Sequence, residues 1–242
     1  MTTATILVPI RIREANFECY LDNLTYCFSS IKLQDHEGGA IVIDYGSASS
    51  YAHKIKSLAG KFNIQYVRGE GGIWSRSRSL NIGIRCAKST HVLFVDADCI
   101  LPTDYISSHI KELSNNKVFT YSPVHDTSKN VIKSSKIVDV KKYSTGIRPK
   151  GNSHMGVSTK WLINNGGFNK DYVGWGGEDD ELWLRLTVAK LNPVKVEKYP
   201  YHLWHPPYGT LMANIGKGKL HRRNVITNRA RLHKLYIKHK KE

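Results

Sequence analysis

Short apolar runs alternate with helical patterns through the first hundred residues, and this alternation constrains the fold more than any other feature. The segments ATILVPI, GGAIVIDYGS, NIQYVRG and HVLFVDAD have the length and composition of strands. Between them, residues 16–33 carry one apolar helical face, and helical patterns follow near Ser50–Ala59 and over residues 75–89. Strands that alternate with helices predict an α/β fold with a mostly parallel central sheet and right-handed crossovers.

Three aspartates lie at the carboxyl ends of these strands, where ligands bind in such sheets. Asp44 follows the second strand, and Asp96 and Asp98 follow the fourth. Because alternate strand residues point to the same side, we expect Asp96 and Asp98 to face one ion together, and carboxylate oxygens suit Mg²⁺ or Mn²⁺. Chance acids at a strand end would give the same short pattern. The glycine-rich fingerprints of dinucleotide-binding and P-loop proteins are absent from the sequence.

The segment GWGGEDDELWLRL, residues 174–186, places three glycines and a tryptophan directly before four acids. Negative charge is favoured in the first turn of a helix, which accounts for one or two of the acids. It does not account for the glycines and the tryptophan. Glycine lets a ligand approach the backbone, and an indole offers a stacking face for a sugar ring, so we interpret this segment as a binding site.

The composition is that of one large globular domain, with 242 residues and 40% hydrophobic content. No apolar run reaches the roughly 18 residues that a membrane span needs. The first residues lack the features of a signal peptide, and the four cysteines contain no C-x-x-C pair. We therefore expect a cytoplasmic protein with reduced thiols.

The net charge of +16 is concentrated in residues 126–150 and 208–242. Two basic segments on a nearly neutral body indicate a polyanionic partner: a nucleic acid, an acidic glycan or an anionic membrane surface. A solvated basic surface without such a partner explains the charge equally well.

Five motifs occur in a fixed order: VPIRIRE, WSRSRSLNIGIRCA, VLFVDADCILP, MGVSTKWLINNGGF and VGWGGEDDELWLRL. Together they resemble the catalytic domain of the β-1,4-galactosyltransferase family and its bacterial relatives, including chondroitin-polymerase-type transferases, from about Val8 to Leu186. The resemblance implies a GT-A fold over residues 1–207, a UDP-sugar donor, a divalent metal and inversion at the anomeric carbon. We expect residues 208–242, beyond the resemblance, to form a basic helical segment that could contact an anionic membrane or another polyanion.

The resemblance also implies a donor site. It assigns the nucleotide to Pro9, Arg11 and Arg13, the uracil to Trp74 and Arg76, and the ribose and donor sugar to Asp96 and Gly156. Asp98 is implied as a metal ligand. A histidine of YPYHLWHPPYG would complete the metal site. We favour His202 and keep His205 as the alternative, because the prolines prevent a choice from strand alternation.

In GWGGEDD the resemblance places Trp175 on a loop over the donor and makes Asp179 the base for the acceptor hydroxyl. Glu178 and Asp180 would bind hydroxyl groups. These roles predict transfer of a hexose or N-acetylhexosamine from a UDP-sugar to a glycan or to a polyanion such as DNA. The alternative is a non-catalytic polyanion-binding protein on a transferase scaffold.

Overall fold

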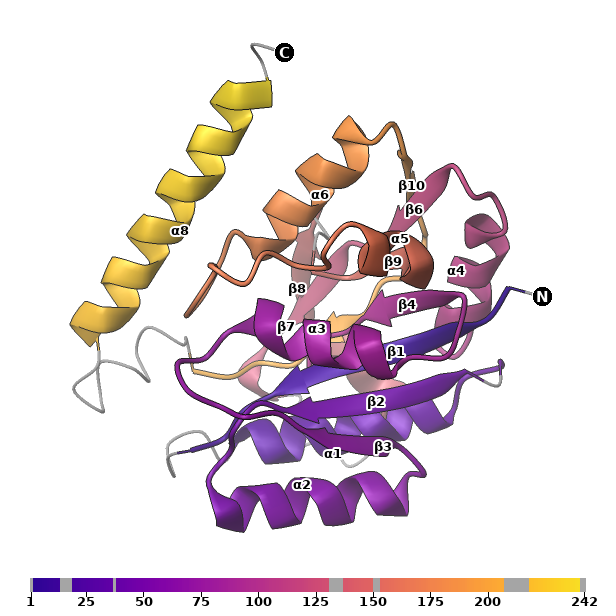
Figure 1. The fold of residues 1–242 in the computed structure, drawn as a ribbon. Coiled ribbons are helices and arrows are strands. Elements are labelled where there is room, and N and C mark those ends of the chain that lie inside the picture. The colour runs from indigo at the N-terminus through magenta and orange to yellow at the C-terminus, as the bar shows by residue number, and fades with distance from the viewer. Residues whose placement is uncertain are drawn as a thin grey trace.

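The computed structural model describes residues 2–13, 19–36, 38–130, 137–149, 153–206 and 218–239. Its main sheet contains β1 (Ala4–Ile10), β2 (Gly39–Asp44), β3 (Gln65–Arg68), β4 (His91–Phe94), β6 (Val118–Tyr121), β9 (Met155–Ser158) and β10 (Asn192–Lys195). The strand order is β10-β6-β9-β4-β1-β2-β3 (Figure 1). β9 is antiparallel to both of its neighbours, and the other neighbouring pairs are parallel. The predicted α/β fold with a mostly parallel sheet is confirmed.

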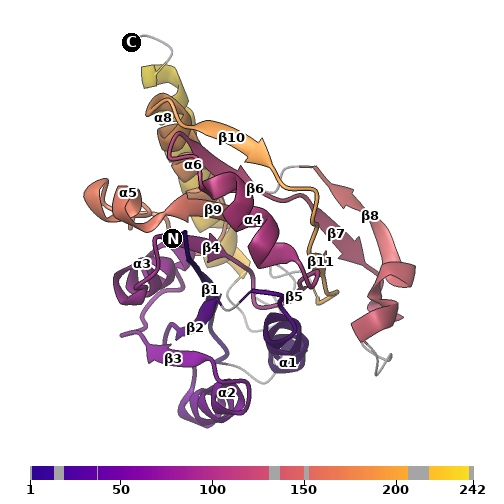
Figure 2. The ribbon, with the colours of Figure 1, turned by 90° about the vertical axis from the view of Figure 1, so that its right-hand side faces the viewer.

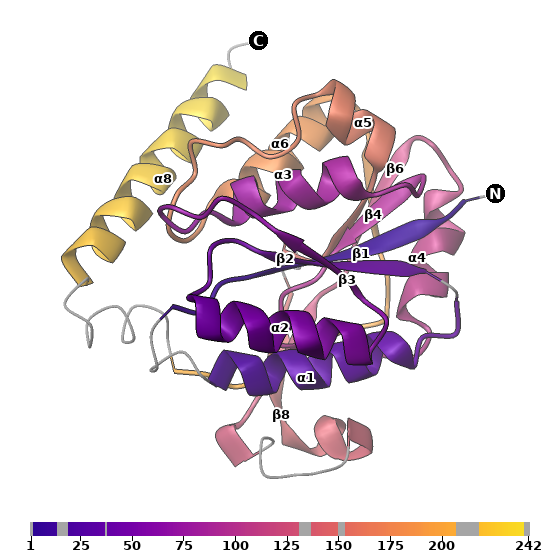
Figure 3. The same ribbon diagram turned by 60° about the horizontal axis from the view of Figure 1, so that its bottom comes forward.

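Helices cover both faces of this sheet (Figures 1 and 3). One face carries α1 (Cys19–Lys32), α2 (Ser49–Lys61) and α4 (Tyr105–Leu113). The other carries α3 (Arg76–Cys86), α5 (Thr159–Asn164) and α6 (Glu178–Val188). The helical patterns of the sequence therefore correspond to α1, α2 and α3, although residues 16–18 of the first pattern lie outside the described part of the chain.

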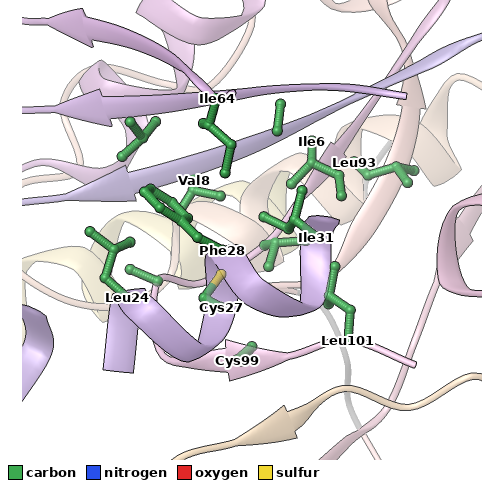
Figure 4. Close-up of a cluster of buried hydrophobic side chains, with 14 of the residues drawn as sticks. Ile6, Val8, Leu24, Cys27, Phe28, Ile31, Ile64, Leu93, Cys99 and Leu101 are labelled. Carbon is green, nitrogen blue, oxygen red and sulfur yellow. The ribbon is translucent and has the colours of Figure 1, made fainter. Parts of the chain in front are cut away.

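The apolar run of β1 is continuous because both faces of the strand are buried. Ile6 and Val8 pack with Phe28 of α1 in one cluster (Figure 4). Leu7, which points the other way, packs with Leu80 of α3 in a second cluster. Burial on both faces places β1 at the centre of the domain and brings its carboxyl end to the functional edge of the sheet.

A second sheet lies beside the first and is best seen in Figure 2. It contains β5 (Cys99–Ile100), β7 (Val124–Thr127), β8 (Ser144–Arg148) and β11 (Tyr201–His202), in the order β5-β11-β7-β8, and the 3₁₀ helix η3 (Ile137–Tyr143) precedes β8. The Leu203 N–H donates to the Asp98 carbonyl at 2.7 Å, directly beyond the β5–β11 pair. This pairing brings the end of the chain's YPYHLWH segment to the carboxyl end of β4.

The helix α8 (Gly218–His239) lies against α6 on the outside of the domain (Figures 1 and 3). Asn228 is its one buried residue among those whose burial is described. The expected boundary between residues 207 and 208 falls outside the described residues. None of the helices in the described segments is both long and apolar enough to span a membrane.

Candidate active site

A cavity of about 850 Å³ lies at the carboxyl ends of β1 and β4, between the sheet edge, the loop at residues 174–177 and α8. Most of the residues that the sequence analysis assigned to a site line this one space. They are Pro9, Arg11, Arg13, Trp74, Arg76, Asp96, Asp98, Trp175, Glu178, Asp179, Asp180, His202 and His205. The remaining two, Asp44 and Gly156, do not appear in its lining.

Asp44 is a structural residue at the end of β2. Its carboxylate is fully buried and accepts hydrogen bonds from the Ser47 N–H at 2.8 Å, the Tyr66 hydroxyl at 2.7 Å and the Arg68 guanidinium at 2.8 Å. These partners fix the turn after β2 and link it to β3. The expectation that Asp44 contacts a ligand such as the donor at this edge of the sheet is therefore not supported, because its oxygens already accept hydrogen bonds within the turn.

Gly156 lies in the interior of the sheet, in β9 between β4 and β6. A Cβ atom there would lie 2.3 Å from Thr120 Oγ1 and 2.8 Å from Leu93 Cδ2. Close packing within the sheet explains this glycine, and the prediction that it approaches the donor sugar is not supported.

Asp98, His202 and His205 form a cluster suited to a divalent cation. The Nε2 atoms of His202 and His205 lie 3.6 and 3.2 Å from Asp98 Oδ2, and the three ligand atoms lie within 4.8 Å of one another. Burial opposes ionisation of Asp98, but the two histidines lower its pKa. One carboxylate and two imidazoles are a donor set for a first-row transition ion. The structure thus places both candidate histidines, His202 and His205, beside Asp98.

The outer nitrogens of both imidazoles already have partners. His202 Nδ1 lies 3.1 Å from Asp126 Oδ1. His205 Nδ1 lies 2.8 Å from the Pro206 carbonyl and 3.2 Å from the Tyr20 hydroxyl. An Nδ1–H that donates to such an acceptor leaves the Nε2 lone pair for a metal, which is the usual arrangement around metal-binding histidines.

Sequence reasoning missed Asp126, because only the pairing of β7 with β11 sets it beside His202. Its hydrogen bond with His202 is the main cause that lowers the pKa of Asp126, and Arg148 at 2.9 Å adds to the effect. In the sequence, nothing about Asp126 within its basic segment indicates that it would contact His202.

Asp96 belongs to a different group of charges from Asp98. Arg76 Nε donates to Asp96 Oδ1 at 3.0 Å, and His154 Nε2 lies 3.5 Å from Asp96 Oδ2. Burial opposes ionisation of Asp96, but Arg76 and then His154 lower its pKa. β4 ends at Phe94, so strand alternation does not govern the two aspartates, and the expected ion shared between them is not supported.

Arg76 connects Asp96 to the acidic motif. Ser75 caps α3 by accepting the Arg78 N–H, which fixes Arg76 in the first turn. The Nη2 atom of Arg76 donates to the Ser153 carbonyl at 2.8 Å. Its Nη1 atom is buried 4.0 Å from Glu178 Oε1 and has no hydrogen-bond partner in the described segments. A donor group left unsatisfied at a cavity wall suits a polar ligand.

The acids of α6 lie in its first turn, after Gly177, which has a φ of 93°. Burial, followed by the charge of Asp179, raises the pKa of Glu178 to about 7. Burial also raises the pKa of Asp179, against the opposing effect of Arg76. Two adjacent carboxyls with raised pKa values in a cavity are typical of a site that handles protons near neutral pH.

Glu178→Gln should change how stability depends on pH. The pKa of Glu178 is raised from 4.5 to about 7, so its stabilising contribution is complete below about pH 4.5 and is lost as the pH rises through 7. We expect the free energy of unfolding of the wild type, relative to that of the variant, to fall between about pH 5 and pH 8. Urea denaturation at four pH values measures this difference. Glu70→Gln, at an exposed position, is the control and should track the wild type; a Glu178→Gln profile parallel to the wild type would contradict the assignment.

The loop that carries Trp175 is held from two sides. The Gly174 N–H donates to the Trp74 carbonyl at 2.7 Å. Asn228 Nδ2 of α8 donates to the Val173 carbonyl at 3.0 Å and to the Trp175 carbonyl at 3.4 Å. The Trp175 side chain itself is 56% exposed at the cavity. The loop thus has a fixed backbone and an accessible indole.

The part played by α8 was not foreseen. Residues 208–242 are predicted to be a basic helical segment that could contact a polyanion or a membrane, and one side of α8 also lines the cavity. Asn224 and Asn228, four residues apart on that side, are the signal that could have indicated a docked helix.

The chain resembles known proteins in sequence. Residues 5–216 match the model of the glycosyltransferase-like family 2. The chain is 24% identical to chondroitin synthase of Escherichia coli over 194 residues, covering 64% of this chain and 28% of that protein. It is 25% identical to human chondroitin sulfate N-acetylgalactosaminyltransferase 1 over 227 residues, covering 84% of this chain and 41% of that protein. The chain therefore spans less than half the length of these relatives.

Solved structures show the same fold. GalNAc-T7 with UDP, GalNAc and Mn²⁺ superposes with a TM-score of 0.67 at 12% identity, over 86% of this chain and 45% of that one. A mannosyltransferase from Pyrobaculum calidifontis with GDP-Man and Mn²⁺ superposes with a TM-score of 0.60 at 16% identity, over 86% and 59% of the two chains. These likenesses confirm the GT-A fold that the sequence motifs implied.

Proposed function

The chain belongs to the glycosyltransferase-like family 2, and from this membership we propose that it is a metal-dependent inverting transferase. It would move a hexose or N-acetylhexosamine from a UDP-sugar to an acceptor hydroxyl. One observation carries the proposal: the cluster of possible metal ligands and the acids of α6 line the same cavity. The first could hold the donor diphosphate through a cation, and the second could activate the acceptor.

Asp98, His202 and His205 would hold the cation. Two imidazoles favour Mn²⁺ over Mg²⁺, which prefers oxygen ligands and keeps its waters. Burial favours neutral His205, yet Asp98 raises its pKa, so a proton and a metal compete for the same Nε2 atom. When bound, the ion supplies positive charge against the leaving diphosphate. Two of the structural relatives are complexes with Mn²⁺, which supports this choice of metal.

Arg11, Arg13 and Trp74 would bind the nucleotide. The two arginines follow β1 and line the cavity, and a guanidinium binds phosphate through paired hydrogen bonds. Trp74 meets Tyr45 edge to face, with ring centroids 6.2 Å apart. This contact orients the indole so that it can stack on a base. Arg76 would hold Asp96 toward the ribose and the sugar.

Asp179 would accept the proton of the acceptor hydroxyl. Inversion requires one base on the face of the sugar opposite the leaving nucleotide, and no covalent intermediate on the protein. Burial raises the pKa of Asp179, which makes its carboxylate a stronger base than an exposed aspartate. Glu178 and Asp180, on either side, would bind hydroxyl groups of the donor and the acceptor.

Calorimetric titration with UDP, in the presence and absence of Mn²⁺, tests the proposal. We expect binding that requires the metal and competes with UDP-sugars. Mass spectrometry of mixtures with labelled UDP-sugars and candidate acceptors, including glycans and duplex DNA, would then identify the product. If UDP does not bind in either condition while polyanions do, the protein is the non-catalytic polyanion-binding alternative.

Asn228→Ala should separate loop positioning from donor binding. The variant removes both hydrogen bonds to the loop backbone and leaves two carbonyls without a donor, so the loop should become mobile. We expect turnover to fall about 10-fold, with UDP affinity in Mn²⁺ nearly unchanged. Steady-state kinetics and UDP titration measure the two effects. Thr227→Ala, on the exposed side of the same helix, is the control; equal losses in both variants would contradict a positioning role.

A further inference from the structure

α8 forms a wall of the cavity although it lies beyond residues 5–216, which match the family. Its contribution is Leu220, His221, Asn224, Val225, Arg229 and Leu232. Their successive spacings are one, three or four residues, so they share one side of the helix. The wall therefore lies outside the part of the chain that matches the family model.

Specific contacts fix the orientation of this helix. Asn228 is 1% exposed and donates to two carbonyls of the Trp175 loop. Arg231 donates to the Asp171 carbonyl, shortly before that loop. A Cβ atom at Gly174 would lie 2.9 Å from the Asn224 side chain, so the loop and the helix are in close contact. The side of α8 that lines the cavity is thus determined by the fold.

The position of the wall makes it an acceptor surface, on the condition that the proposed function is correct. α8 packs beside α6, whose first turn carries Asp179. Arg11 and the metal cluster belong to other elements, at the carboxyl ends of β1 and β4 and in or just after β11. An acceptor that delivers its hydroxyl to Asp179 would therefore extend along α8.

The chemistry of the wall favours an acceptor with a negative charge. Val225 and Leu232 offer an apolar surface for a sugar ring. Burial lowers the pKa of His221, so Arg229 is the permanently charged member of the six. The acids of α6 would repel an anionic acceptor, and a guanidinium on the facing wall offsets that repulsion. A neutral acceptor would not be repelled by these acids, so its binding would not depend on this cation.

We propose that α8 is the acceptor wall and that Arg229 recognises an anionic group of the acceptor, either a carboxylate or a phosphate. A guanidinium binds both groups through paired hydrogen bonds. Arg229 is then a specificity-determining residue outside the shared family domain.

Transfer assays with matched acceptors test this proposal. The probes are a uronate-terminated oligosaccharide, its neutral methyl ester and a glycosyl phosphate, each with the labelled UDP-sugar that the enzyme hydrolyses. For Arg229→Gln we expect KM to rise about 10- to 100-fold for the anionic acceptor that is used, while KM for the methyl ester and donor hydrolysis stay within about 2-fold. Whichever anionic probe responds identifies the source of the charge. Arg229→Lys should give an intermediate KM.

Arg223→Gln is the control, because Arg223 lies on the opposite side of α8 and lines a separate surface hollow. It should leave every acceptor unchanged. Equal losses for the anionic and neutral acceptors in Arg229→Gln, or a wild type that does not prefer the anionic probe, would overturn the proposal. Absence of any UDP-sugar turnover in the wild type would instead overturn the proposed function, and the role of Arg229 with it.

Discussion

Asp98→Ala is expected to lower sugar transfer by at least about 10³-fold and to remove the dependence of UDP binding on Mn²⁺. The variant deletes the carboxylate on which the Nε2 atoms of His202 and His205 converge. Two neutral imidazoles without a negative ligand hold a divalent cation weakly, so the charge that faces the leaving diphosphate is lost. UDP titration and product analysis at saturating donor measure both effects.

Graded variants around the same cluster make the assignment specific. His202→Ala and His205→Ala should each weaken Mn²⁺-dependent UDP binding, because both rings present Nε2 to Asp98. Asp126→Asn leaves all three ligands in place and changes only the partner of His202 Nδ1, for which we expect a smaller loss of about 10-fold in metal affinity. Full activity of Asp98→Ala in EDTA would refute a metal role for the cluster.

Asp179→Asn is expected to lower turnover by about 10² to 10⁴, the usual contribution of a general base, with near-normal binding of UDP and Mn²⁺. The amide keeps the shape of the side chain and cannot accept the proton. Trp175→Ala should instead raise KM, because loss of the exposed indole weakens binding of the sugar and the acceptor. Steady-state kinetics with both substrates varied separates the two variants.

The neighbouring acids test the register of this motif. Glu178→Gln and Asp180→Asn should mainly raise KM, because their carboxyls are assigned to hydroxyl binding. If Asp179→Asn retains wild-type turnover while one of these two loses it, the base has been placed one residue away from its true position.

The positions of several candidate residues could be predicted where they follow directly from one strand or helix and its adjoining turn. Asp96 and Asp98 were placed at the end of a buried strand, and the acids of residues 178–180 at a helix start after glycines. Both signals are local, since they depend on residues within one element and its adjoining turn. The same local reasoning finds no support for Asp44, because nothing near it in the chain shows that Tyr66 and Arg68 bind its carboxylate.

What the sequence could not predict depends on contacts between distant segments. Asp126 approaches His202 through the parallel pairing of β7 with β11, and both strands are too short for their hydrophobic pattern to fix a register. The same applies to α8. Its docking on the Trp175 loop depends on polar side chains such as Asn228, and a helix with so many cations has the composition of a solvent-exposed one.

The polar docking of α8 has a consequence for the dynamics of the domain. Among the described residues, none of α8 belongs to the three clusters of buried apolar side chains. Opening of this helix therefore costs less free energy than unfolding of the sheet, and its amide protons should exchange with deuterated solvent well before those of β1. A ligand that touches both α8 and the sheet edge would slow this exchange. Amide exchange over residues 218–239 would then report occupancy of the cavity without any need for turnover.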